Sequence, residues 1–148
     1  MAEFEYQNIE AWNTSIRLAT SVGRLKIGSN LKAAADAHQQ AFAQAGLACA
    51  LIAEGSGRDG PTQLGMYRDA RGALAQARSW LHVLAAVMNE PDTLFGNELD
   101  LAEQASRQLG AILRTAERGP AGPRPPMRPG PAPSGPRPAG PPRAPRRD

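Results

Sequence analysis

The chain has 148 residues, room for one domain, and a formal net charge of +3. Residues 1–118 hold 11 Lys and Arg against 13 Asp and Glu, whereas residues 119–148 hold six Arg and one Asp. The excess positive charge therefore belongs to the C-terminal stretch and not to a folded basic module. No apolar run approaches the roughly 20 residues of a membrane span, and the N-terminus lacks the features of a signal peptide. We expect a cytoplasmic protein.

The first predicted helix runs from about Asn8 to Lys26, and Gly28-Ser29-Asn30 then breaks the chain. Apolar residues step by three or four along it, as one helical face requires. This predicted inner face comprises Ile9, Trp12, Ile16, Ala19 and Val22. Basic residues around the connection that follows offset the helix dipole, which is the simplest interpretation of Arg17, Arg24, Lys26 and Lys32.

The second predicted helix runs from about Leu31 to Ala53, and its inner face is mostly alanine, which allows close helix packing. That face comprises Ala34, His38, Ala41, Ala45, Ala48 and Ile52. His38 fits a core hydrogen bond, a pore lining or a ligand, but no metal-ligating residue lies three or four positions later. We predict no metal site. The single cysteine, Cys49, cannot form an internal disulfide and suits a small buried position.

The stretch GSGRDGP at 55–61 spells a nucleotide-binding pattern, G-x-G-x-x-G. Such a pattern binds phosphate when it follows a strand, but here a helix precedes it. We therefore predict an ordinary turn, in which Gly55 ends one helix and Pro61 begins the next. Glu54 lies at an unfavourable helix end for a carboxylate, and an ion pair with Arg58 would relieve this.

The third predicted helix runs from Pro61 to about Asn89 and carries a heptad face. The face comprises Tyr67, Ala70, Leu74, Ala77, Leu81, Leu84 and Met88. A second apolar edge, formed by Trp80, Val83 and Val87, indicates that this helix is either central in the bundle or covered by another subunit, and the alanine-rich core favours the second. We therefore expect a homo-oligomer.

The fourth predicted helix runs from about Asn97 to Glu117, and Gly119-Pro120 stops it. Its inner residues are predicted to be Leu101, Ala105, Leu109, Ile112 and Ala116. Four amphipathic helices with short connections predict an all-α fold, an up-down-up-down four-helix bundle over residues 1–118.

Residues 119–148 contain 12 of the 14 prolines and almost no large apolar side chain. Such a segment buries too little apolar surface to offset the entropy of ordering, so we predict a disordered tail with polyproline II character. Its P-x-x-P matches indicate protein recognition only weakly, because a proline-rich segment contains them by chance.

Two stripes of arginine lie on the third and fourth predicted helices, within about 80° and about 40° of helix circumference. The candidate nucleic-acid-binding residues are Arg68, Arg71, Arg78, Arg107, Arg114 and Arg118. Such stripes fit a surface for phosphates. They also fit a solvated helix face, since Asp69, Glu103 and Glu117 lie nearby in sequence.

Two segments, LIAEGSGR at 51–58 and MYRDARGALAQARSWL at 66–81, resemble a bacterial four-helix-bundle family. That family includes the proteins encoded in intervening sequences of large-subunit ribosomal RNA genes. It also includes Avd, the accessory variability determinant of diversity-generating retroelements. The chain departs from the family pattern at Leu51, Ala73 and Gln76, where Asn, Ser and Glu are usual. These departures leave the choice between the two branches open.

The resemblance covers about residues 4–119, and LAEQASRQLGAILRTAERG at 101–119 is similar to the last helix of the Avd branch. It implies a homopentamer that binds RNA or DNA and partners a reverse transcriptase. The intervening-sequence branch implies instead a structural scaffold, with the tail binding a protein partner. No residue set typical of catalysis occurs in the sequence, so we expect neither an enzyme nor a cofactor.

Overall fold

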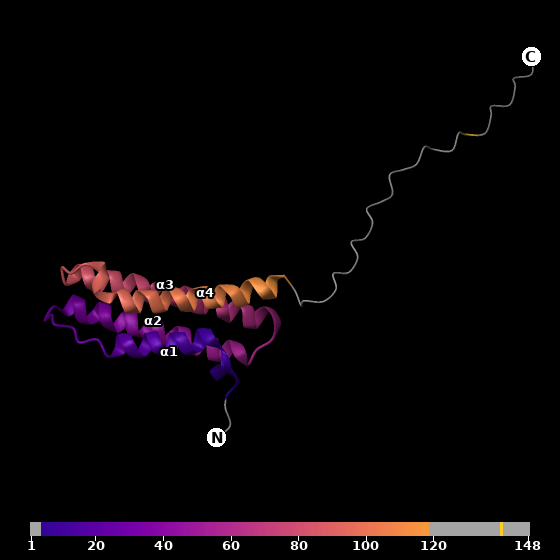
Figure 1. Cartoon of the computed structure of the whole chain (residues 1–148), viewed down its shortest axis with the longest axis horizontal. Helices are drawn as coiled ribbons and strands as arrows, with labels where there is room; N and C mark the ends of the chain where they lie inside the picture. Colours follow the sequence, from indigo (N-terminus) through magenta and orange to yellow (C-terminus); the bar gives the residue numbers. More distant parts are fainter. Residues whose placement is uncertain (1–3, 119–139, 141–148) are drawn as a thin grey trace, which may run out of the picture.

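A computed structural model describes residues 4–118 and Gly140 of the chain, so the predicted tail at 119–148 lies almost entirely outside the described residues. The described part is all-α, as predicted, and its four long helices pack together as a bundle (Figure 1). The elements are η1 (Glu5–Asn8), α1 (Glu10–Gly23), α2 (Lys32–Ser56), α3 (Gly60–Val87), η2 (Asp92–Phe95) and α4 (Gly96–Glu117). The two short 3-10 helices, η1 and η2, were not predicted.

Each long helix has two neighbours in the bundle. Helix α1 packs on α2 and α4, and α3 packs on the same two helices, with the most extensive interface between α2 and α3. Successive helices run antiparallel, so the start of α1 and the end of α4 lie at one end of the bundle (Figure 1). This end also carries the α2–α3 turn, which places the glycine-rich stretch beside both chain ends of the bundle.

The inner face of α1 differs from the prediction. The buried residues of α1 are Ala11, Thr14, Ser15, Leu18 and Val22. Ile16, which was predicted to lie inside, is 37 % exposed, while Ile9, Trp12 and Ala19 are partly buried at the edge of the core. Val22 is buried as predicted, but the other buried positions lie on the neighbouring stripe, which contains Ala11, Leu18 and two hydroxyl residues.

Helices α2 and α3 bury the faces predicted for them, with few exceptions. Five alanines of α2 are fully or almost fully buried, together with Ile52, and six of the seven heptad residues of α3 are buried. Because alanine side chains are small, the two backbones lie close together, and the long interface buries little apolar volume per residue. Met88 is only partly buried, and on α4 the exposed Ala116 is replaced in the core by Leu113.

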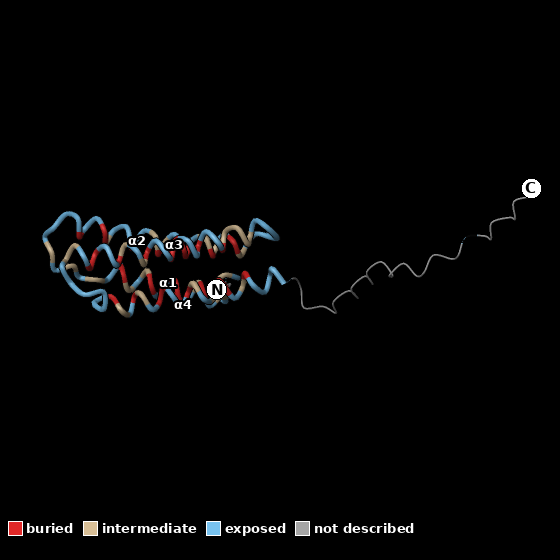
Figure 2. Tube along the Cα trace, turned by 90° about the horizontal axis from the view of Figure 1, so that it is seen from above, coloured by how far each residue is buried: buried red, intermediate tan, exposed pale blue. Residues whose placement is uncertain are grey.

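The apolar edge predicted on α3 is narrower than expected. Trp80 and Val87 pack partly against the core of the same chain, and Val83 alone of the three is clearly exposed, at 39 %. Figure 2 shows the same division along all four helices, with buried positions facing the bundle axis and exposed positions outside. Among residues 4–118, no helix is long and apolar enough to cross a membrane.

Candidate nucleic-acid interface

The glycine-rich stretch is a turn between two helices, but Gly55 does not end α2 as predicted. Helix α2 continues to Ser56, and Gly57 is its C-cap. Gly55 is buried, and a Cβ atom on it would lie 2.9 Å from the Tyr67 ring of α3. The glycine is therefore required because the Tyr67 ring packs directly on the α2 backbone.

Side chains on both sides of the turn satisfy the end of α2. The predicted ion pair exists, since Arg58 Nη2 lies 3.2 Å from Glu54 Oε1. The Gln63 amide donates a hydrogen bond to the Gly55 carbonyl at 3.1 Å. Gly60 begins α3 with a positive φ of 58°, a conformation that glycine adopts without strain. Pro61 follows at the first turn of α3, close to its predicted position.

The two arginine stripes meet across the α3–α4 interface. Arg68 Nη2 lies 3.2 Å from Glu117 Oε1, so the first arginine of the α3 stripe forms an ion pair with α4. Both side chains are about half exposed, which limits the stabilisation from this pair because water and salt screen it. The pair shows which levels of the two helices face each other, because helix packing brings Arg68 beside Glu117.

The antiparallel register places the remaining arginines at matching levels. Three residues along α3 from the ion pair, and three back along α4, Arg71 lies level with Arg114. Seven residues further, Arg78 lies level with Arg107. At a rise of about 1.5 Å per residue, these two levels are about 10 Å apart. The six predicted residues, called the arginine array below, therefore lie along two adjacent helices.

Most of the arginine array keeps its charge uncompensated by nearby acids. Among the described residues, no carboxylate lies within 4 Å of any of its members except Arg68. Arg78 is half-buried, and the other members are exposed. Arg114 folds over Gly110, where a Cβ atom would lie 3.3 Å from its guanidinium nitrogen. A small residue at 110 thus makes room for this arginine against the helix.

The side chains of His38 and Cys49 both form hydrogen bonds to backbone carbonyls within the bundle. His38 Nε2 donates a hydrogen bond to the Val22 carbonyl at 2.6 Å, which satisfies a backbone carbonyl in the last turn of α1. Burial raises the pKa of Cys49 from 9.0 to about 11, and its thiol donates weakly to the Ala45 carbonyl. In the part of the chain described, no three His, Cys, Asp or Glu residues gather as metal ligands would.

Two features of the structure have no signal in the sequence. Glu98 is 7 % exposed in the first turn of α4, and its Oε1 accepts a hydrogen bond from Ser21 Oγ of α1 at 2.6 Å. Phe4, Tyr6 and Trp12 form an aromatic stack at the start of α1. Neither has a periodic signal: the first pairs residues distant in sequence, and the second depends on the fold of the short η1 helix.

The fold defines the class of the protein as an all-α four-helix bundle. No known family model matches the chain, and no significant match was found among curated proteins or solved structures. The geometry of its own side chains is therefore the main guide to its function.

Proposed function

We propose that this protein is a non-enzymatic accessory protein that binds nucleic acid through the arginine array. The observation that carries the proposal is the alignment of arginines from α3 and α4 at matching levels, five of the six without a carboxylate within 4 Å among the described residues. Guanidinium groups bind phosphate oxygens well because they are planar, always charged and rich in donors. A two-helix surface of this kind suits the backbone of a structured RNA or DNA.

The resemblance to Avd adds the partners of this proposal. Avd proteins assemble as pentamers and associate with a reverse transcriptase, so we propose a ring-like homo-oligomer that brings several arginine arrays to one nucleic acid. The net charge of +5 carried by residues 119–148 adds attraction that does not depend on nucleotide sequence. The protein would thus hold RNA or DNA for the polymerase of a diversity-generating retroelement and perform no chemistry itself.

Replacing four members of the arginine array tests the proposal directly. The full chain carrying Arg71→Gln, Arg78→Gln, Arg107→Gln and Arg114→Gln should bind structured RNA at least tenfold more weakly at low salt. The slope of log affinity against log salt should also fall by about 3, because each lost phosphate contact removes roughly 0.7 to 0.9 from it. Filter binding over a salt series measures both quantities.

A matched control removes the same charge elsewhere. Arg17→Gln, Arg24→Gln, Lys26→Gln and Lys32→Gln change four cations near the α1–α2 connection and should leave affinity within about threefold of the original. Equal losses in the two variants would show that net charge, and not the arginine array, drives binding. Undetectable binding by the original chain at low salt would contradict the function itself and favour the scaffold alternative.

A further inference from the structure

The aromatic stack runs from the core of the bundle to solvent. The Phe4 and Tyr6 rings have centroids 5.6 Å apart and are almost parallel, with 5° between their planes. The Tyr6 and Trp12 centroids are 5.1 Å apart, with 54° between the rings. Trp12 packs against the core, whereas Phe4 is 62 % exposed. The stack therefore exposes the Phe4 ring to solvent, while the partly buried Trp12 anchors it to the bundle.

Hydrogen bonds hold the exposed end of this stack in place. Within η1, Phe4 N donates to Gln7 Oε1 at 2.9 Å, and Gln7 N donates back to the Phe4 carbonyl at 3.0 Å. Asn13 of α1 donates to the Gln7 carbonyl at 2.9 Å, which ties η1 to the bundle. These hydrogen bonds therefore fix the backbone of Phe4 in a position that leaves its ring exposed. A fixed exposed aromatic surface is typical of a binding site.

The charge around the stack selects the kind of ligand. Glu5 lies between the two stacked rings in sequence, whereas Glu10, two residues before Trp12, lies on the opposite side of α1, beside α4. Glu5 is exposed, and among the described residues no cation lies within 4 Å of its carboxylate. This carboxylate repels phosphate and attracts guanidinium groups. Aromatic rings beside acids suit proline-rich segments that contain arginine, because proline packs on rings and arginine pairs with acids.

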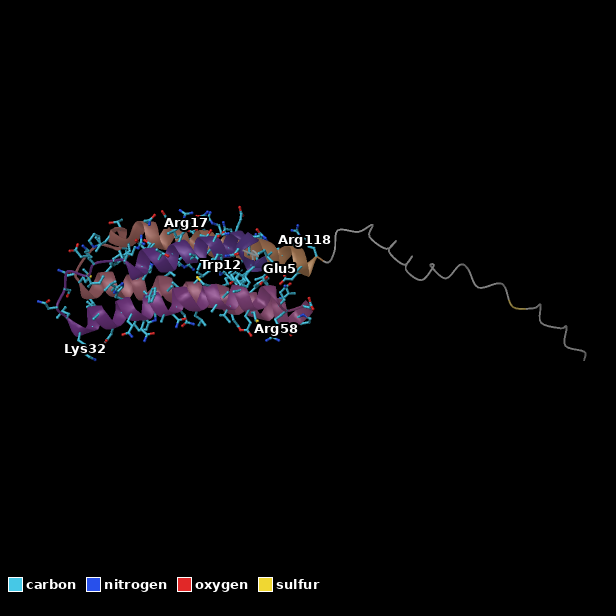
Figure 3. All side chains as sticks on the ribbon, turned by 90° about the horizontal axis from the view of Figure 1, so that it is seen from below. Glu5, Trp12, Arg17, Lys32, Arg58 and Arg118 are labelled. Atoms are coloured by element: carbon cyan, nitrogen blue, oxygen red, sulfur yellow. The ribbon has the colours of Figure 1, made fainter. Side chains whose placement is uncertain are left out.

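The chain itself contains such a segment shortly after α4. Residues 123–129 read PRPPMRP, with proline at every third position, which is the period of polyproline II, and arginine at 124 and 128. Figure 3 shows Arg118, the residue after α4, at the same end of the bundle as Glu5. At about 3.1 Å per residue, the chain from 118 to 129 can extend to roughly 34 Å. That exceeds the width of two packed helices, roughly 20–24 Å.

We propose that residues 123–129 dock on the aromatic stack of the same chain. The prolines pack on Phe4 and Tyr6, and Arg124 or Arg128 pairs with the Glu5 carboxylate. This contact is an intramolecular use of the surface and does not depend on nucleic-acid binding. The contact also joins two parts of the chain with opposite net charge, since residues 1–118 are negative and residues 119–148 are positive.

The two tryptophans of the chain provide the readout, because Trp12 belongs to the aromatic stack and Trp80 lies on α3 outside it. In NMR spectra of the full chain, Arg124→Ser, Pro126→Ser, Arg128→Ser and Pro129→Ser together should shift the Trp12 indole N–H signal by more than a linewidth. The Trp80 signal should stay in place. The matched control, Pro142→Ser, Arg143→Ser, Pro145→Ser and Arg146→Ser, removes the same charge and the same number of prolines, and should leave both signals unchanged.

Two outcomes of the tail substitutions alone overturn the docking. One is a Trp12 signal identical in the original chain and in the 124–129 variant. The other is an equal Trp12 shift in both tail variants, which assigns the effect to diffuse charge. Introducing Phe4→Ala should make the Trp12 signal insensitive to the 124–129 substitutions, and continued sensitivity would place the contact elsewhere. If a ten-nucleotide oligoadenylate moves the Trp12 signal while the tail substitutions do not, the stack binds bases and the proposal is wrong.

Discussion

Among single residues, Gly55 shows how a sequence pattern acquires a physical meaning. As part of G-x-G-x-x-G it suggested a phosphate loop, and the preceding helix removed that interpretation. In the structure Gly55 does not end α2. It is a point of contact with α3, because the Tyr67 ring occupies the space that a side chain at position 55 would fill. The pattern that resembles a family signature is thus explained here by packing between α2 and α3.

Gly55→Ala should destabilise the bundle despite the better helix propensity of alanine. The new methyl group would lie 2.9 Å from the Tyr67 ring, and such overpacking costs about 1–3 kcal/mol. Gly46→Ala in the same helix is the control, because nothing lies within 4 Å of its added Cβ atom. It should stabilise by roughly 0.5–1 kcal/mol. Urea unfolding of both variants measures the difference; if the two shift stability in the same direction, Tyr67 moves aside freely.

At the level of elements, the contact between α1 and α4 is the least predictable part of the bundle. The buried face of α1 includes Ser15 and Thr14, so its apolar periodicity points to the neighbouring stripe. Across the interface, the buried carboxylate of Glu98 is stabilised by the Ser21 hydroxyl and by the positive end of the α4 dipole. A polar contact thus helps to set how these two helices align.

Ser21→Ala should weaken this helix pair. It removes the hydroxyl donor from a carboxylate that is 7 % exposed, and a buried acceptor without its partner costs about 1–3 kcal/mol. Thr115→Ala removes an exposed hydroxyl that bonds only within α4 and should change stability by less than roughly 0.5 kcal/mol. Thermal or urea unfolding compares them. Equal effects would mean that the helix dipole alone holds Glu98.

For the whole molecule, the distribution of apolar surface bears on assembly. The core contains many alanines and few aromatic side chains, and Val83 and Leu47 expose apolar surface on the α2–α3 side. Trp80 and Val87 are taken up by the core, so the outer edge of α3 is smaller than the sequence indicated. The proposed homo-oligomer therefore depends on few exposed side chains, which makes it sensitive to single substitutions.

Val83→Arg should dissociate the proposed oligomer, because a guanidinium buried at a subunit interface without a partner costs several kcal/mol. Ala75→Arg adds the same group at an exposed position of α3 and should leave assembly intact. Light scattering gives the mass of each variant, and circular dichroism checks that both remain helical. A monomeric original chain, or a Val83→Arg variant of unchanged mass, would contradict the assembly predicted on this edge.

Much of the fold was predictable because helical periodicity is a local property of the chain. The period of apolar residues located all four long helices, and the heptad face of α3 named six of its buried residues correctly. Errors arose where local rules compete with packing: α1 ends at Gly23 and not at Lys26, and Ile16 faces out although it is apolar. The arginine stripes were visible in the sequence, but the levels at which they face each other were not.

Periodicity and composition were enough to establish the number and order of the long helices, the turn at 55–61 and the separation of an almost neutral bundle from a basic, proline-rich end. These are properties of residues that are neighbours along the chain. The buried face of α1, the contact of Tyr67 with Gly55, the Ser21–Glu98 bond and the matching of Arg71 with Arg114 became visible only in the folded bundle. Each of them depends on residues from different elements, and their relation is fixed by how helices pack and not by any local preference.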